Sequence, residues 1–558
     1  MIRKGLLLLA AAAITAGPFV TPAQAVSPAQ TQAPTPGSAP AQASFTANPA
    51  HIKVLSAVLQ TMQNNYATFS TVSPGPQDIF DYNIGSLWQK GVDGSGTTVA
   101  LLEGWDDPAL GQFMQTMDGQ YGLPDPVIQT IFPSGPLPAQ CPPAMVALGS
   151  YGSCQAWIQE LRLDVLSVHL IAPYATIVIS ATPADSEIID DAASNVAPPE
   201  MMRALEYISA NHLANVISIS TGTGESTYPN GAAEIHAADP GLLTAAAAGI
   251  PVLTGTGDCG VVQNLATASS QCGNTSAGPD TAAWDDSPWV TAVSGSVPNI
   301  STGWVKVGPD PLWHVGGIFS GGAGFSSIYP RPSYQDGVAQ ITGSQMRSVP
   351  DITMDGQGGT SEATPMLAGV LALATQLNDG QNIGPVNPAL YGTLGPGGVS
   401  NGIADVVSGN NSVISPGTGQ VLVPGFTAGP GFDVASGWGT INARLFVPAL
   451  VNATSALDKE SAARQEASQE LSQLQQAITL TVQDIPPGGI SLVSASGFLP
   501  GHPVQLAVDG NPIVTLTAST LGTIGYILDP AEIGVAAGSH TLTMRSMLIT
   551  TSASFTSG

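Results

Sequence analysis

Short runs of β-branched and aliphatic residues alternate along the chain with longer segments of helical periodicity. From about residue 78 onward, "TTVALLEG", "ATIVISATP", "ANVISISTG", "IPVLTGTGD" and "PWVTAVSG" each have the length of a buried strand. Between them stand helical patterns, namely "CQAWIQELRLDVLSVHL", "PEMMRALEYISANHL" and "GLLTAAAAG". This alternation predicts an α/β domain with a mostly parallel sheet and helices on both faces. In such a sheet, functional residues gather at the carboxyl ends of the strands.

The pattern changes after about residue 447. The stretch "ATSALDKESAARQEASQELSQLQQAI" is dense in charge and helical in period, and it predicts a helical connector over residues 448–480. Residues 481–558 alternate with period two between turn residues, which is typical of a small immunoglobulin-like β-sandwich.

The first 25 residues have the three parts of a secretory signal. Arg3 and Lys4 precede the apolar run "GLLLLAAAAITAG" and then "AQA", so cleavage is expected before Val26. Residues 26–73 are predicted to hold a disordered leader and a short helical segment. No later segment offers eighteen uninterrupted apolar residues, so we expect no membrane span and a secreted, extracellular protein.

Charge and cysteine content narrow the function classes. Only 9% of the residues are charged, but 39 acids face 13 bases and give a net charge of -26, which argues against nucleic acid as a partner. Near the sequence pI of about 4.2 the net charge is small, so repulsion between the protein's own charges is weak and the fold can tolerate an acidic medium. Cys141 with Cys154 and Cys259 with Cys272 favour two local disulfides, although four cysteines allow three pairings.

Ser361 stands where a turn of small residues meets a long apolar run, in "GQGGTSEATPMLAGVLAL". A serine directly before a helix that carries Pro365 in its first turn lies near unsatisfied backbone N–H groups. An alkoxide or oxyanion is favoured there. The alternative is that Thr360 or Ser361 only caps the helix.

A serine nucleophile needs a base, and histidine is poorly supported in that role. His169, in "LSVHLIAP", is more typical of a helix residue than of a base. Residues 398–402 spell G-x-S-x-G, but they lack the strand before and the helix after that a nucleophile elbow requires.

Carboxylates are the better partners. Glu160 and Asp164 are four residues apart on a predicted helix and share one face, where they form either a coupled pair or two solvated acids. Asp258 ends the strand "IPVLTGTGD", at the edge of the sheet where an α/β site lies.

In this order, these motifs over residues 74–447 resemble the sedolisin family of serine-carboxyl peptidases, in which glutamate replaces histidine in a subtilisin-like fold. The family's Ser-Gly-Thr-Ser-x-x-x-Pro motif is matched by residues 358–361 and Pro365, and its Glu-x-x-x-Asp helix by Glu160 and Asp164. The resemblance implies that Ser361 is the nucleophile, Glu160 the general base, Asp164 its orienting partner and Asp258 the oxyanion acid. Glu103 would extend the proton network. The residue after the family's nucleophile is usually small, whereas here it is Glu362.

The resemblance also implies one calcium ion. "IADVVSGNN" and "AGPGFDVASGWG" are similar to the family's calcium site, with Asp405, Asp433 and the carbonyls of Val406, Gly429 and Gly431 as ligands. Hard oxygen ligands on glycine-rich turns suit calcium, and the alternative is an acidic loop without metal. No organic cofactor is implied.

The sequence therefore predicts a secreted, acid-active serine-carboxyl endopeptidase that hydrolyses polypeptides. An unperturbed glutamate has a pKa of about 4.3 and would serve as a base in acid where imidazole would be charged. The alternative is a non-catalytic exported surface or interaction protein that keeps the peptidase fold. The β-sandwich would then be its binding part, and it is a candidate for cell-surface attachment in either case.

Overall fold

The computed structural model describes residues 45–558 with short gaps. The gaps are residues 70–72, 134, 148–152, 183–198, 223, 229–230, 264–271, 273–277, 456–457, 477, 499–502, 520–521 and 547–548. The predicted signal peptide and leader, up to residue 44, lie outside the described residues.

A seven-stranded sheet forms the centre of the α/β part, in the order β13-β6-β5-β4-β1-β3-β2. All of its strand pairings are parallel, as the alternating pattern predicts. Its strands are β1 (Thr98–Glu103), β2 (Val127–Ile131), β3 (Thr176–Ala181), β4 (Val216–Ile219), β5 (Val252–Gly255), β6 (Val290–Ser296) and β13 (Ile352–Asp355). The two edge strands, β2 and β13, were not predicted from the sequence.

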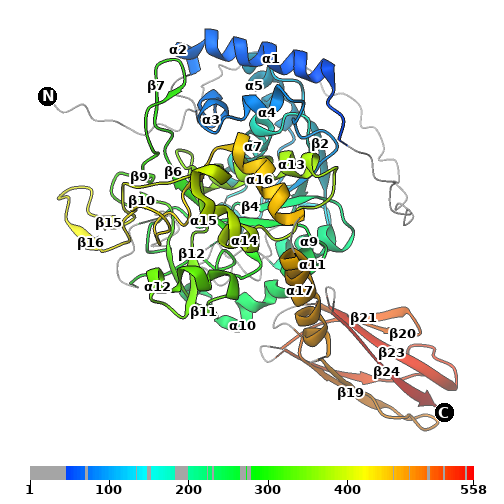
Figure 1. Ribbon diagram of the computed structural model, residues 1–558. Coiled ribbons are helices and arrows are strands. Elements are labelled where there is room, and N and C mark those ends of the chain that lie inside the picture. Colours follow the sequence, from blue (N-terminus) through cyan, green and yellow to red (C-terminus); the bar gives the residue numbers. More distant parts are fainter. Residues whose placement is uncertain are drawn as a thin grey trace. The chain divides into compact units, whose positions relative to one another are not determined.

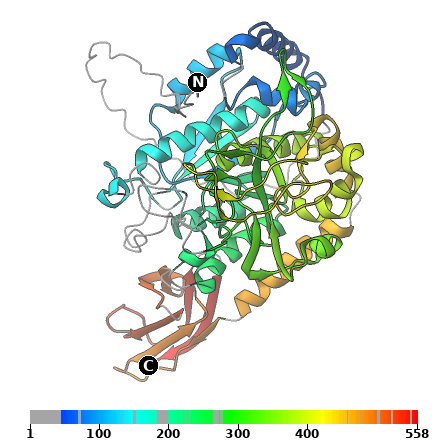
Figure 2. The ribbon, with the colours of Figure 1, turned by 90° about the vertical axis from the view of Figure 1, so that its left-hand side faces the viewer.

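Helices cover both faces of this sheet (Figure 1), and Figure 2 shows the same elements turned by 90°. Along β1, Val99 and Leu101 belong to the hydrophobic cluster that includes α7, α13 and α16, whereas Ala100 and Leu102 join α9 and α11 in a second cluster. A strand buried on both faces has no polar side, which is why these strands read as continuous apolar runs.

The helices vary widely in length. They are α1 (Pro49–Asn64), α2 (Tyr66–Phe69), α3 (Pro76–Asp81), α4 (Gly85–Trp88), α5 (Leu110–Tyr121), α6 (Pro143–Ala147), α7 (Cys154–Ile171), α9 (Pro199–Ala210), α10 (Ala232–Ile235), α11 (Asp239–Ala247), α12 (Ala339–Thr342), α13 (Thr360–Leu377), α14 (Val386–Ala389), α15 (Gly395–Gly397), α16 (Ala443–Ser455) and α17 (Asp458–Gln476). Helix α1 is the helical segment predicted before the α/β part, and its Leu55, Val58 and Met62 are buried in the main cluster.

Short strands lie outside the main sheet. They are β7 (Ile300–Ser301), β8 (Val305–Lys306), β9 (His314–Val315), β10 (Phe319–Ser320), β11 (Gly324–Pro330), β12 (Met346–Val349), β14 (Ile403–Ala404), β15 (Val413–Ile414), β16 (Val421–Val423) and β17 (Thr440–Ile441).

Helices α7 and α13 pack against each other. They run in the same direction, since Glu160 lies near Ser361 and the later Ile171 lies near the later Gly369. Gly369 on α13 makes this approach close. A Cβ atom added there would lie 2.8 Å from Cβ of Ile171 and 3.3 Å from the carbonyl oxygen of Val168. The contact fixes α7 relative to the start of α13, and both carry candidate site residues.

One buried ion pair ties β13 to its neighbour β6. Arg347 donates from Nη1 to Oδ1 of Asp351 (2.8 Å) and from Nη2 to Oδ2 (2.6 Å), and neither side chain is exposed. Asp351 also accepts from the Tyr391 hydroxyl at 2.8 Å and from the Ala292 backbone N–H at 2.8 Å. The bidentate geometry and the extra donors are what such a desolvated pair requires.

The C-terminal residues form two antiparallel sheets, of three and four strands, around one hydrophobic cluster. The strands are β18 (Thr479–Thr481), β19 (Ser491–Ser496), β20 (Pro503–Val508), β21 (Asn511–Thr517), β22 (Thr523–Leu528), β23 (Gly538–Ser546) and β24 (Ile549–Ser557). The all-β content agrees with the period-two pattern, and the immunoglobulin-like class stays a prediction.

Both disulfides have the local pairing that the sequence favours, Cys141–Cys154 and Cys259–Cys272. Among the described helices, none combines the length and apolar character needed to span a membrane.

We predict that Gly369→Ala destabilises the fold because the added methyl group meets α7. The expected loss is about 1–3 kcal/mol in the free energy of unfolding, the range for overpacking a core. Gly119→Ala is the matched control, since Gly119 is an exposed glycine in α5 with open space around its Cβ direction. Helix propensity should make that variant more stable, by about 0.5–1 kcal/mol. Equal thermal midpoints for the two variants would contradict the close contact.

Candidate active site

Ser361 is the second residue of α13, directly after the turn of Gly358 and Gly359. The sequence predicted Pro365 in the first turn of this helix, and that was wrong. The helix begins at Thr360, so Pro365 falls in the second turn. A proline there has no N–H for the carbonyl four residues before it, which is the carbonyl of Ser361. The Ser220 hydroxyl, after the end of β4, lies 3.5 Å from that carbonyl oxygen and donates to it.

Glu160 and Asp164 lie on one side of α7, as their spacing predicts. Ser153 caps the start of this helix, its side chain accepting from the Ala156 N–H at 3.3 Å. Burial raises the pKa of Glu160 to about 7, although a hydrogen bond with the Ser361 side chain opposes the rise and the charge of Asp258 adds to it. The candidate nucleophile, base and oxyanion acid are therefore within electrostatic reach of one another.

Asp258 follows β5 and is held against the first residue of α13. Its Oδ1 accepts from the Thr360 backbone N–H at 2.8 Å and from the Thr360 hydroxyl at 3.0 Å. Burial raises the pKa of Asp258, and the two bonds from Thr360 lower it. Since Oδ1 already accepts twice, the proton that burial favours belongs on Oδ2.

Gly359 makes room for this carboxyl group. Its φ of 93° lies in the region that favours glycine, and an added Cβ would stand 2.7 Å from Oδ2 of Asp258. Any other residue would push the acid away from the turn that carries Ser361.

Glu103 and Asp164 form a pair of interacting acids next to the candidate base. Glu103 ends β1, and both acids are buried. Burial, and then the charge of Asp164, raise the pKa of Glu103 well above its usual range. Burial, and then the charge of Glu160, raise the pKa of Asp164, while contacts with the Ser220 hydroxyl and with Glu103 lower it. No well-formed hydrogen bond from the described residues reaches either carboxylate, so a protonated Glu103 donating to Asp164 satisfies both.

The structure thus brings together all five acids and hydroxyls that the sequence singled out: Glu103, Glu160, Asp164, Asp258 and Ser361. Their catalytic roles stay a prediction. Sequence reasoning missed Ser220, whose signal is its place after a strand, where an α/β site gathers its residues. It also missed that Glu362 turns into the core, where it meets other acids. The signal there is a charged residue at the start of an otherwise apolar helix.

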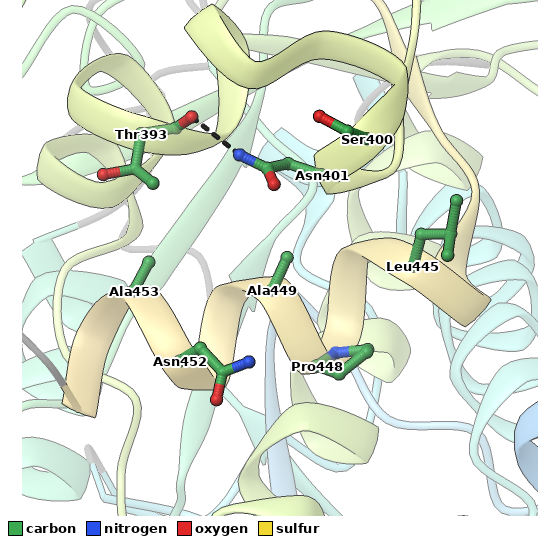
Figure 3. Close-up of a pocket in the computed structure, with 8 residues that line it drawn as sticks. All are labelled: Thr393, Ser400, Asn401, Leu445, Pro448, Ala449, Asn452 and Ala453. Atoms are coloured by element: carbon green, nitrogen blue, oxygen red, sulfur yellow. Dashed lines mark hydrogen bonds between the residues drawn. The ribbon is translucent and has the colours of Figure 1, made fainter.

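Two residues set aside as catalytic candidates in the sequence analysis, His169 and Ser400, contact other groups in the structure. His169 is buried on α7, with Nε2 3.1 Å from Oδ1 of Asp118. Ser400 donates to the carbonyl of Gly397 at 2.7 Å and lines a surface hollow of about 480 Å³ beside α16 (Figure 3). The residues lining this hollow include no acid and no histidine, so it offers Ser400 no base.

The loops that resemble a calcium site lie side by side. Oδ2 of Asp405 accepts from the Gly431 N–H at 2.8 Å, and Oδ2 of Asp433 accepts from the Gly429 N–H at 2.8 Å. Oδ1 of Asp405 is buried and has no hydrogen-bond partner among the described residues. Oδ1 of Asp433 also accepts from the Ala435 and Ser436 N–H groups at 2.9 Å, so Oδ1 of Asp405 is the carboxylate oxygen left for a hard cation such as Ca²⁺.

Comparisons with known proteins find relatives by sequence and by fold. Kumamolisin from Bacillus sp. (strain MN-32) is 28% identical over 395 residues, which cover 66% of this chain and 62% of the relative. Tripeptidyl-peptidase 1 from Rattus norvegicus is 30% identical over 288 residues, or 46% of each chain. Pseudomonas sedolisin, a serine-carboxyl proteinase solved with two molecules of pseudo-iodotyrostatin, superposes with a TM-score of 0.53 and 23% identity over 67% of this chain and 96% of that one.

The chain spans about half to three fifths of the length of these curated relatives. No family model matches it. The likeness to the solved sedolisin supports the subtilisin-like α/β fold.

We predict that Glu103→Gln makes stability less dependent on pH. The raised pKa values of Glu103 and Asp164 mean that the folded state binds protons more tightly than the unfolded state. The stability they contribute is present below the ordinary pKa of about 4 and is lost as the pH rises through the folded values. An amide at position 103 donates to Asp164 at every pH, so the thermal midpoint should fall less between pH 4 and 7. A tenfold difference in proton affinity between the folded and unfolded states corresponds to about 1.4 kcal/mol.

The control for this measurement is Glu532→Gln, which changes an exposed acid of the C-terminal sheets in the same way. Its thermal midpoint should follow the parent at each pH. If Glu103→Gln also followed the parent, the shared proton would be refuted.

Proposed function

We propose that this chain, which is homologous to serine-carboxyl peptidases of the sedolisin family, is itself a serine-carboxyl endopeptidase acting on polypeptides. These relatives confirm the family resemblance that the motifs predict. The observation that carries the proposal is the meeting of the Ser361 hydroxyl with Glu160, beside an oxyanion acid, Asp258, bound to the same turn.

In the proposed reaction, Oγ of Ser361 attacks the scissile carbonyl carbon and its proton passes to the Glu160 carboxylate. The carbonyl oxygen becomes an oxyanion, which accepts a hydrogen bond from the protonated Asp258. The C–N bond then breaks, and Glu160 returns the proton to the leaving amine. Water repeats the same steps on the acyl-enzyme and releases the acid product.

Asp164 and Glu103 support the base. When Glu160 takes up the serine proton its negative charge disappears, so repulsion by Asp164 is relieved in the transition state. The proton held by Glu103 keeps the Glu103–Asp164 pair at a single negative charge in the buried site. Pro365 and Ser220 help to align Ser361, since the freed carbonyl is held from β4.

The proposed chemistry requires an ionised Glu160 next to a protonated Asp258. Two coupled acids lose their protons in two macroscopic steps that belong to the pair. The hydrolysis rate is highest at pH values between these two steps, where the pair holds one proton. Burial raises both pKa values, so we expect an optimum in the weakly acidic range, between about pH 4 and 7. An oxyanion acid that has lost its proton repels the charge it should stabilise, and activity then falls toward alkaline pH.

We also propose that the enzyme is exported, on the strength of the signal-like first 25 residues and the two disulfides. The C-terminal sheets hold none of the matched motifs, which leaves attachment to a cell surface as their proposed role. For calcium, the proposed ligands are Asp405 and Asp433 with the carbonyls of Val406, Gly429 and Gly431. The ion would supply structural charge compensation between these loops, away from the reaction.

The direct test is Ser361→Ala, assayed on a denatured protein substrate from pH 3 to 8. We expect a loss of turnover on the order of 10⁴-fold or more, because the variant has no nucleophile. The fold should be kept, because Ser361 lies inside the helix as its second residue and the N-cap position is Gly359. Ser400→Ala is the matched control and should retain the parent rate. Equal rates for parent and Ser361→Ala, or an optimum at pH 8, would exclude the proposed mechanism.

Removing calcium should lower the thermal stability of the protein, while the arrangement of residues around Ser361 is kept. We expect one bound ion per chain by elemental analysis, and a lower thermal midpoint with a chelator at pH 6. A ligand at a hundred times its dissociation constant contributes about 2.7 kcal/mol. Asp405→Asn should lose the ion and the chelator effect, whereas Asp125→Asn, at an exposed acid, should keep both. A parent protein with no calcium and no response to chelation would rule out the ion.

A further inference from the structure

Glu362, the residue after the candidate nucleophile, is fully buried, and the groups that act on its carboxyl group are Asp355, Ser73 and Gly358. Its Oε2 accepts from the Gly358 backbone N–H at 2.5 Å, and its Oε1 accepts from the Ser73 hydroxyl at 2.5 Å. One side chain therefore joins three segments: the stretch before α3, the turn before α13, and α13 itself.

Two more buried acids stand beside it. We call Asp78 of α3, Asp355 at the end of β13 and Glu362 the acid cluster. One carboxylate oxygen from each lies within 4.8 Å of the others, and all three residues have no exposed surface. None of the ion pairs formed by the described residues includes a member of this cluster. Three charges so close in the core repel strongly, so the cluster must be neutralised by protons or by a cation.

The hydrogen bonds favour protons. Oδ2 of Asp78 accepts from the Gly75 N–H at 3.0 Å, and Asp355 accepts from the Gln357 N–H at 2.9 Å and from Gln357 Nε2 at 3.1 Å. With the two bonds to Glu362, five of the six carboxylate oxygens already have a donor. A cation would have to displace these donors, whereas a proton on the remaining oxygen, Oδ1 of Asp78, bonds to Asp355 and leaves them in place.

Among the described residues, the surroundings of the acid cluster add negative charge, and the one cation near it, Lys306, is bound by other acids. Burial, and then the charge of Asp355, raise the pKa values of Asp78 and Glu362 well above their usual range, and burial raises the pKa of Asp355 to about 6. The other titratable groups that face the cluster are Tyr82, Tyr121 of α5, Asp81 of α3, and the Lys306–Asp310 pair, in which Lys306 is bound by Asp81 and Asp310. A rise in pH thus charges the cluster without compensation.

The turn that Glu362 holds is the one that places the candidate site. Glu362 binds the N–H of Gly358 at one end of this turn, and Asp258 binds the N–H of Thr360 at the other. Gly359 lies between them, against the Asp258 carboxyl group. A displacement of Gly358 therefore moves both the oxyanion acid and the residue before Ser361.

We propose that Glu362 is a positioning residue for Ser361, an inference that rests on the proposed function. With protons shared across the acid cluster it clamps the Gly358–Thr360 turn in acid, and when the cluster ionises the clamp is released. The turn is thereby a second pH control on activity, separate from the acids that touch the substrate.

The test compares pH–rate profiles, each normalised to its own maximum. Glu362→Gln keeps an oxygen for the Gly358 N–H but cannot ionise, so the alkaline limb should move up by about half a pH unit or more. Glu362→Ala loses the clamp and should lower kcat about 10- to 100-fold at every pH, with little change in KM. Asp286→Asn, at a buried acid with a raised pKa elsewhere, is the matched control and should leave the limb in place. A limb that Glu362→Gln does not move would overturn the proposal.

A second measurement does not depend on activity. Hydrogen exchange of the peptide spanning residues 355–365 should speed up in the parent chain between pH 4 and 7, beyond the intrinsic dependence on pH. In Glu362→Gln this excess should be absent. If no hydrolysis is found but the exchange difference is seen, the proposed function fails and the clamp stands. An equal excess in both proteins, or calorimetric Ca²⁺ binding that Glu362→Gln abolishes, would show that the cluster is no proton clamp.

Discussion

A carboxyl group buried without a cation or enough hydrogen-bond donors is driven to hold a proton, and this constraint acts at several places in the α/β part of the molecule. The chain has 39 acids and 13 bases, so most buried acids can find no Lys or Arg partner. Glu103 with Asp164, and Asp78 with Glu362, both show the result, with pKa values raised chiefly by burial. Because these pKa values are raised, the stability that the two pairs contribute is present at low pH and is lost as the pH rises.

The frame of the sheet is held differently. At the start of β13, a guanidinium group that keeps its charge in all working conditions binds Asp351 on both oxygens. At the other end of the same strand, Asp355 belongs to a proton-sharing cluster. Strand β13 thus has the Arg347–Asp351 ion pair, whose charges stay the same over the working pH range, at one end. At its other end is the acid cluster, whose charge depends on the pH. Local loosening near Ser361 can accordingly occur while the sheet stays intact.

Much of this could be read from the sequence, for physical reasons. Five central strands are buried on both faces, so their apolar runs were plain. Strand β2 is an exposed edge, and β13 alternates apolar and polar residues instead of forming an apolar run. Glu160 and Asp164 were found because helical spacing is local. The partners of Glu362 were not, because Asp78 reaches it only through the fold. The calcium ligands and the catalytic roles stay predictions, since they depend on a bound ion and on a reaction.

Pro365 gives the molecule a property that goes beyond its helix. Because it leaves the Ser361 carbonyl without a helical donor, that oxygen is attached to the residue after β4, in the middle of the sheet. The start of α13 is thereby held by the sheet as well as by its own helical hydrogen bonds. Any shift of the carboxyl end of β4 reaches the backbone of Ser361 through Ser220, so this contact couples the centre of the sheet to the first turn of α13.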